Sequence, residues 1–187
     1  AFSKTIILAL GDSLTEGFGV KKEEAYPYLL QKDLLLSGHE VKVINGGVSG
    51  STSASAFFRL KWYIKTRPDI VILALGGNDG LRGLSVEKMN ENLSRAIEFA
   101  KSKKITILLA GMKIPLNYGK EYADSFRKVF YELAKKYKLP FIPFLLKDVG
   151  GITILNQPDG IHPTPEGHKI MTQTVLKYLQ PLLPKKE

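Results

Sequence analysis

Two residues near the end of this chain have the types and the spacing of an oriented catalytic base. Asp159 and His162 stand three residues apart in the sequence Asp-Gly-Ile-His-Pro. In a turn, this spacing lets the aspartate carboxylate accept the Nδ1–H of the histidine, which leaves Nε2 free to act as a base. Pro163 disfavours helical backbone angles at His162 and so holds the imidazole outside the helix that follows.

A hydroxyl that such a base could activate is found near the start of the chain. Ser13 lies in the sequence Gly-Asp-Ser-Leu, directly after an apolar segment. At a strand-to-helix junction the backbone N–H groups point outward at the positive end of the helix dipole, which suits a nucleophile whose attack generates an oxyanion. Taken alone, Ser13 would be read as a helix cap, and the Asp159–His162 pair is what makes it a candidate nucleophile.

Gly50 and Asn78 are candidate donors to that oxyanion, together with the N–H of Ser13. Both lie in glycine-rich stretches that follow apolar segments, and glycine lets the backbone approach a substrate closely. One such donor is worth roughly 3–4 kcal/mol in the transition state. The neighbouring Asp12 and Asp79 are predicted to order their turns and not to act on substrate.

The composition excludes several other chemistries. The chain has 187 residues, no Cys and three His, so it can form neither a disulfide, nor a thiolate zinc site, nor a Cys nucleophile. His39 has no carboxylate motif around it, and His168 is predicted to be exposed or to pack within the last helix. The net charge of +9 favours anionic partners, but no nucleic-acid-binding module is recognisable, so we expect no nucleic acid.

The elements that must position these residues follow from an alternation of short apolar runs and longer amphipathic segments. Five runs read as buried strands, at residues 5–10, 41–45, 70–75, 105–110 and 141–144. Helical periodicity covers residues 27–37, 53–65, 86–100 and 122–137, with Ser85 as an N-cap, and a last helix begins at Thr164-Pro165. The alternation predicts one α/β domain over residues 1–187, with a five-stranded parallel sheet between helices.

In such sheets ligands bind beyond the carboxyl ends of the strands, and the polar segments described above fall there. No apolar run reaches the roughly 18 residues of a membrane span, so we expect no membrane insertion.

The polar segments together resemble the four sequence blocks of the GDSL, or SGNH, hydrolase family. The blocks occur in order along essentially the whole chain as Gly11-Asp12-Ser13-Leu14, Gly50, Gly77-Asn78-Asp79 and Asp159-x-x-His162. Residues 76–83 and Asn117-Tyr118-Gly119 are similar to the bacterial thioesterase I, arylesterase and lysophospholipase subgroup. The resemblance implies a flavodoxin-like three-layer α/β/α sandwich with no metal or organic cofactor. It also implies Ser13 as nucleophile, His162 as base, Asp159 as orienting acid, and Ser13, Gly50 and Asn78 as oxyanion donors.

These residues predict an enzyme that hydrolyses small carboxylic esters or thioesters of fatty or aryl acyl groups through an acyl-enzyme. The acyl chain is expected to lie along Leu81, Leu84, Ile114, Leu116 and Tyr118. Two alternatives stay open: a carbohydrate O-deacetylase on the same scaffold, and a flavodoxin-like module that binds phosphate or nucleotide. The second leaves the Asp159–His162 pair unexplained. The subgroup resemblance and the start at Ala1 favour a periplasmic or secreted location.

Overall fold

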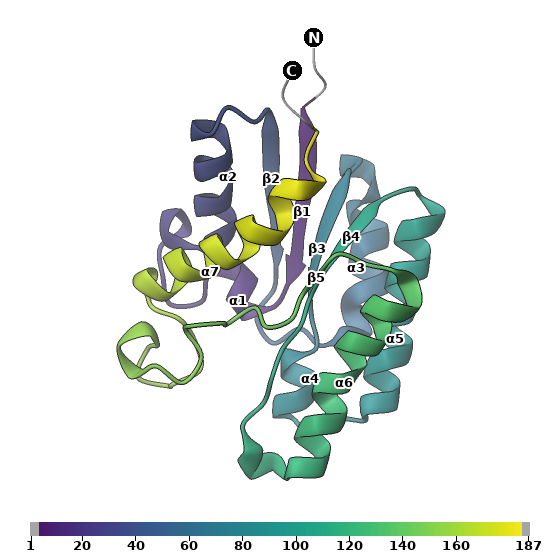
Figure 1. Ribbon diagram of the computed structural model, residues 1–187, viewed down its shortest axis with the longest axis vertical. Helices are drawn as coiled ribbons and strands as arrows, with labels where there is room; N and C mark the ends of the chain where they lie inside the picture. Colours follow the sequence, from purple (N-terminus) through teal and green to yellow (C-terminus); the bar gives the residue numbers. More distant parts are fainter. Residues whose placement is uncertain (1–3, 185–187) are drawn as a thin grey trace.

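A parallel sheet of five strands forms the centre of the molecule in the computed structural model, which describes residues 4–184. The strands pair in the order β2-β1-β3-β4-β5, and every pair is parallel (Figure 1). Their bounds are β1 Thr5–Gly11, β2 Val41–Gly47, β3 Ile70–Ala74, β4 Thr106–Ala110 and β5 Phe141–Ile142. The predicted α/β fold with five parallel strands is therefore confirmed.

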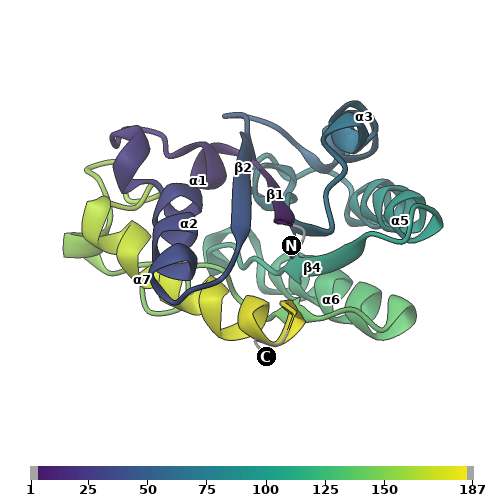
Figure 2. The same cartoon turned by 90° about the horizontal axis from the view of Figure 1, so that it is seen from above.

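Helices cover both faces of the sheet, as the three-layer prediction requires. On one face α2 (Tyr26–Leu36) packs against α7 (Pro165–Leu179), and on the other α3 (Ala56–Tyr63), α5 (Val86–Ser102) and α6 (Lys120–Tyr137) lie in a row (Figure 2). Every residue of β3 is buried, because helices exclude water from both of its sides. None of the helices within residues 4–184 is long and apolar enough to cross a membrane.

Each strand differs from its predicted bounds by one or two residues at one end. The first two strands run on into glycines, with Gly11 paired to Gly47, because residues without side chains let these two strands stay in register up to the rim. The last strand is only two residues long, since Pro140 and Pro143 flank it and proline cannot donate a ladder hydrogen bond.

The helix ends agree more closely with the sequence signals. The Ser85 side chain accepts a hydrogen bond from the N–H of Lys88, and the Thr164 side chain accepts one from Gly167, so both predicted N-caps are confirmed. The helix expected to begin at Ser13 is present as the single turn α1 (Ser13–Glu16). The other one-turn helix, α4 (Gly77–Leu81), was not predicted, because a single turn is too short to show a helical period.

His168 joins the two helices that cover the first face. It is buried, so of the two predicted settings the packed one is right and the exposed one is wrong. Its Nδ1 accepts a hydrogen bond from the Tyr26 N–H at 3.2 Å, which links α7 to α2. Burial lowers the pKa of His168 to about 4, so the ring is neutral at physiological pH.

Candidate active site

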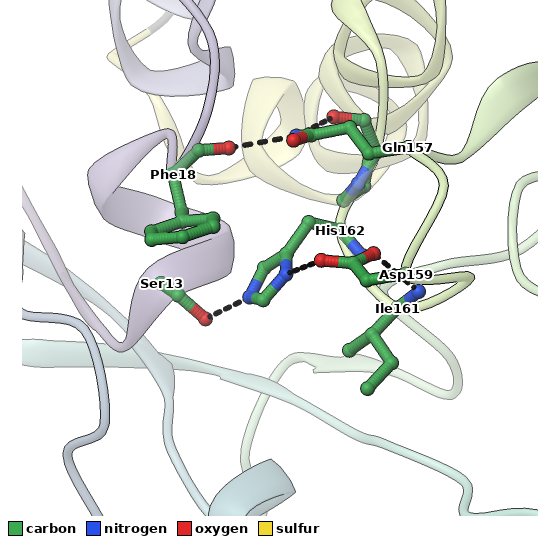
Figure 3. Close-up of polar contacts among 7 residues, drawn as sticks. Ser13, Phe18, Gln157, Asp159, Ile161 and His162 are labelled. Carbon is green, nitrogen blue, oxygen red and sulfur yellow. Dashed lines mark hydrogen bonds and ion pairs between the residues drawn. The ribbon is translucent and has the colours of Figure 1, made fainter.

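Ser13, His162 and Asp159 form a continuous line of contacts at the carboxyl ends of the strands (Figure 3). Ser13 opens α1 directly after β1, while Asp159 and His162 lie in the loop that precedes α7. The His162 Nε2 atom lies 2.9 Å from the Ser13 Oγ, and the His162 Nδ1 atom lies 2.6 Å from the Asp159 Oδ2. With Nδ1 engaged by the carboxylate, Nε2 can accept the serine proton.

Asp159 lies close to solvent, and hydrogen bonds to its carboxylate favour the ionised form. Its Oδ1 accepts hydrogen bonds from the backbone N–H groups of Ile161 at 2.9 Å and His162 at 3.0 Å, so the tight turn closes on its own carboxylate. The hydrogen bonds from the His162 backbone and ring, followed by that from Ile161, lower the pKa of Asp159 to about 2. The carboxylate can therefore orient the imidazole and stabilise its positive charge over a wide pH range.

A second carboxylate holds the turn that presents Ser13, and unlike that of Asp159 it is buried. Asp12 caps α1, accepts a hydrogen bond from the Leu14 N–H at 3.0 Å and is only 4% exposed. Burial raises the pKa of Asp12 to about 6, and the hydrogen bond from Leu14 offsets only part of that rise. The predicted role of Asp12 in ordering the turn is confirmed.

Arg59 fastens the strand ends below this turn. Its guanidinium reaches in from α3 and donates to the Gly11 carbonyl at 3.0 Å and also to the Gly46 carbonyl. Burial lowers its pKa, and Asp12 is among the neighbours that oppose this shift. Sequence reasoning missed Arg59. The available signal was its position next to Leu60, a buried residue of the same short helix.

Of the two other predicted oxyanion donors, Gly50 lies in a turn and Asn78 lies in the one-turn helix α4. Gly50 has a φ of +77°, a left-handed conformation that favours glycine, and its carbonyl accepts a hydrogen bond from Arg82 Nη2 at 3.0 Å. The Asn78 Nδ2 donates to the Ser51 carbonyl at 2.9 Å, which leaves its second amide hydrogen for another acceptor. Asp79 accepts the Ser53 N–H at 2.8 Å and so orders this loop, as predicted.

Gln157 ties the two halves of the site together. Its Nε2 donates to the Phe18 carbonyl at 2.8 Å and to the Pro163 carbonyl at 2.9 Å. The Phe18 ring lies over the imidazole of His162, with the ring centroids 4.5 Å apart (Figure 3). Gly19 leaves room for this amide, since a Cβ there would lie 2.1 Å from the Gln157 Oε1. Sequence reasoning missed Gln157, although it stands two residues before Asp159.

An apolar cavity of about 270 Å³ borders the site. Gly77 and Ile161, which adjoin Asn78 and His162 in the chain, belong to its wall. Of the five residues predicted to hold an acyl chain, Leu81 and Ile114 line this cavity, whereas Leu84, Leu116 and Tyr118 do not and are exposed. Sequence reasoning missed the other apolar lining residues, which are Met112, Pro115, Phe144 and Leu146.

No cluster of three or more His, Asp or Glu side chains with the arrangement of a metal site occurs among residues 4–184. The side chains of Ser13, His162 and Asp159 support one reaction by themselves. In it the Ser13 hydroxyl attacks a substrate and transfers its proton to His162.

Comparison with known proteins places this arrangement in a family. A sequence model described as the GDSL-like Lipase/Acylhydrolase family matches residues 9–170. The chain is 35% identical to Esterase TesA of Pseudomonas aeruginosa over 178 residues, which cover 95% of this chain and 89% of that protein. It is 34% identical to thioesterase 1/protease 1/lysophospholipase L1 of Escherichia coli (strain K12), covering 95% and 84% of the two chains. A crystal structure of TesA superposes with a TM-score of 0.92 at 35% identity, covering 96% of this chain and 100% of that one.

Proposed function

Because this chain belongs to the GDSL-like lipase/acylhydrolase family and is thus a serine hydrolase that acts on ester bonds, we propose that Ser13 is its nucleophile. His162 is the general base, and Asp159 orients and stabilises the imidazolium. The observation that carries this proposal is the pair of short contacts from Asp159 to His162 and from His162 to Ser13, at 2.6 and 2.9 Å.

The proposed reaction transfers an acyl group in two steps. The Ser13 Oγ attacks the ester or thioester carbonyl carbon while the His162 Nε2 takes the hydroxyl proton. The tetrahedral intermediate then expels the alcohol or thiol, which receives that proton from His162. A water molecule, deprotonated by His162 in turn, attacks the acyl-enzyme and releases the carboxylic acid and Ser13.

Three donors are proposed to stabilise the negative charge on the carbonyl oxygen. They are the N–H groups of Ser13 and Gly50 and the amide of Asn78. The Ser13 N–H belongs to the first turn of α1, where backbone donors have no partner within the helix. Arg82 holds the neighbouring Gly50–Ser51 peptide through its hydrogen bond to the Gly50 carbonyl, which limits the movement of the loop that carries the Gly50 N–H. The hydrogen bond to Ser51 likewise fixes the Asn78 amide before substrate arrives.

The cavity beside Ile161 is proposed to hold the acyl chain of a fatty or aryl ester. Its 270 Å³ lies just below the range of roughly 300–1,000 Å³ that is common for ligand sites. This size favours short or medium acyl groups over long ones. The wall formed by Leu81, Met112, Ile114 and Phe144 offers such a group apolar contacts.

The nucleophile is tested with a fluorophosphonate probe, which forms a covalent bond with an activated serine. We expect the wild-type chain to be labelled and Ser13→Ala not to be labelled. The rate at which Ser13→Ala hydrolyses p-nitrophenyl esters should be lower than that of the wild type by roughly 10³-fold or more. Labelling that persists in Ser13→Ala would contradict the assignment. Binding of a nucleotide without any labelling would support a phosphate-binding module instead.

The acyl cavity is tested with p-nitrophenyl esters of rising chain length and with acetylated sugars. Ile114→Phe fills the cavity, so the preferred chain should become shorter. The matched variant Leu84→Phe adds the same ring outside the cavity and should leave the preference unchanged. Equal chain-length profiles for the two variants would remove the cavity from the proposal, and a strong preference for acetylated sugars would support a deacetylase.

A further inference from the structure

The outward side of α3 carries aromatic and basic side chains in place of the usual polar surface. Phe58, Lys61, Trp62 and Lys65 follow the spacing i, i+3, i+4, i+7, which puts them on one side of the helix and of the 3-10 turn that continues it. All four are exposed, Phe58 by 61% and Trp62 by 58%. Arg95 of α5 lies beside them. These five residues are called the α3 face below.

The cations of the α3 face stand against its aromatic rings. The Lys65 Nζ lies 3.5 Å from the centre of the Trp62 ring, and the Arg95 Cζ lies 5.1 Å from that of Phe58. Arg95 is also 3.8 Å from the ring centre of Phe57, which meets Phe99 of α5 edge to face. Apolar and charged groups therefore lie together on α3, and this helix is at the periphery of the molecule in Figure 2.

The charge of this surface is of one sign. Residues 49–68 contain no Asp or Glu, and the whole chain carries +9. The two acids of α5 on either side of Arg95 are engaged elsewhere, Glu91 with Lys88 at 2.7 Å and Glu98 with the Tyr137 hydroxyl. Within residues 4–184, none of the three cations of the α3 face forms an ion pair with a carboxylate.

We propose that the α3 face docks the protein on an anionic lipid surface. Tryptophan and phenylalanine side chains enter the boundary between headgroups and acyl chains, while lysine and arginine pair with anionic headgroups. A second copy of this chain is a poor occupant, because it would bring two sets of cations together. Nucleic acid is disfavoured too, because Lys65 and Arg95 stand over the rings on which bases would stack. Docking in this way is peripheral and does not depend on the proposed ester chemistry.

The sequence supplies a reporter for this test, since Trp62 is the only tryptophan in the chain. Vesicles of ether-linked phosphatidylglycerol and phosphatidylcholine in equal amounts cannot be hydrolysed by an esterase, so binding is measured apart from turnover. We expect these vesicles to shift Trp62 emission to shorter wavelength and to protect it from iodide, and phosphatidylcholine alone to do neither. Binding should weaken as salt is added.

Charge reversal separates the α3 face from the overall charge. Lys61→Glu combined with Lys65→Glu should lower the vesicle partition coefficient by roughly tenfold or more, measured by co-sedimentation. The control combines Lys32→Glu on α2 with Lys177→Glu on α7, two exposed lysines on the opposite face, and should change it by less than about twofold. Unchanged thermal unfolding shows that each variant is folded. The proposal is overturned by equal losses in the two double variants, by equal binding to both kinds of vesicle, or by single-stranded DNA binding at the α3 face without vesicle binding.

Discussion

The segment that carries Ser13 and the loop that carries Asp159 and His162 meet in one site, yet they are held in place differently. Residues 11–16 continue β1 and are mostly buried, with Asp12 at 4% exposure. Residues 157–162 are largely exposed, and the Asp159 side chain is 38% exposed. Burial and backbone packing fix the first region, whereas a few hydrogen bonds fix the second. Apart from changes at Ser13 itself, changes in the first region should therefore mainly affect stability, and changes in the second should mainly affect catalysis.

The largest effect is expected on the exposed side of the site. Asp159→Asn keeps an oxygen that can accept the two backbone N–H groups but removes the charge that orients and stabilises the imidazolium. We expect kcat for a p-nitrophenyl ester to fall by roughly 10³- to 10⁴-fold. The urea unfolding free energy should change by less than about 1 kcal/mol, because the side chain is exposed. A small loss of kcat with a large loss of stability would break the comparison.

A pair of glycines tests the packing difference directly. A Cβ at Gly47 would lie 2.1 Å from the backbone N of Glu16 and 2.6 Å from its Cα, so Gly47→Ala must move backbone. We expect it to lower the unfolding free energy by about 3 kcal/mol or more. Gly160 has a φ of +71° but meets nothing within 4 Å, so Gly160→Ala should cost only about 1 kcal/mol. Similar costs in urea denaturation would mean that both regions are packed alike.

Asp12 should make its own region sensitive to pH. Its pKa of about 6 lies above the ordinary value of 3.8, so the folded chain holds this proton more firmly than the unfolded chain does. Its contribution to stability is thus most favourable below about pH 4 and declines as pH rises to about 6. Asp12→Asn retains the acceptor for Leu14 and removes this dependence. Relative to the wild type, the variant should gain roughly 3 kcal/mol between pH 3.5 and pH 7.5.

Urea unfolding at these two pH values measures the gain from Asp12→Asn. A difference between the variant and the wild type that stays constant with pH would show that Asp12 is not held in a desolvating environment.

The smallest effect is expected at the link between the two regions. Gln157→Leu removes both donated hydrogen bonds, so Phe18 and the loop with His162 are positioned less closely. We expect kcat to fall roughly tenfold with little change in KM. Gln157→Glu should behave similarly, because a carboxylate cannot donate to the two carbonyls. Gln173→Leu removes a glutamine that donates a hydrogen bond to Asp33, away from the site, and serves as control. A change in KM alone would place Gln157 in substrate binding.

The sequence predicted residues whose partners are local and missed those whose partners are distant. Asp159 and His162 stand three positions apart, so turn geometry alone suggested their contact, and the strand runs indicated where Ser13 would lie. Arg59 and Gln157 act on carbonyls 48 and 139 residues away, and nothing in their own neighbourhoods specifies those partners. The cavity residues Phe144 and Leu146 were missed for the same reason. They are far from Leu81 in the sequence and lie near it because β4 pairs with β5.

The hydrogen bond between Tyr26 and His168 has a consequence for how the protein is made. Ser13 leaves the ribosome early, and its proposed base follows 149 residues later. The loop that bears His162 leads directly into α7, and the bond from Tyr26 to His168 joins α7 to α2, so we expect this loop to take its place when α7 docks on α2. A growing chain is therefore expected to carry an inert serine until α7 has been made. Ester hydrolysis begins with the last helix, so the onset of activity during refolding reports the arrival of the C-terminal segment.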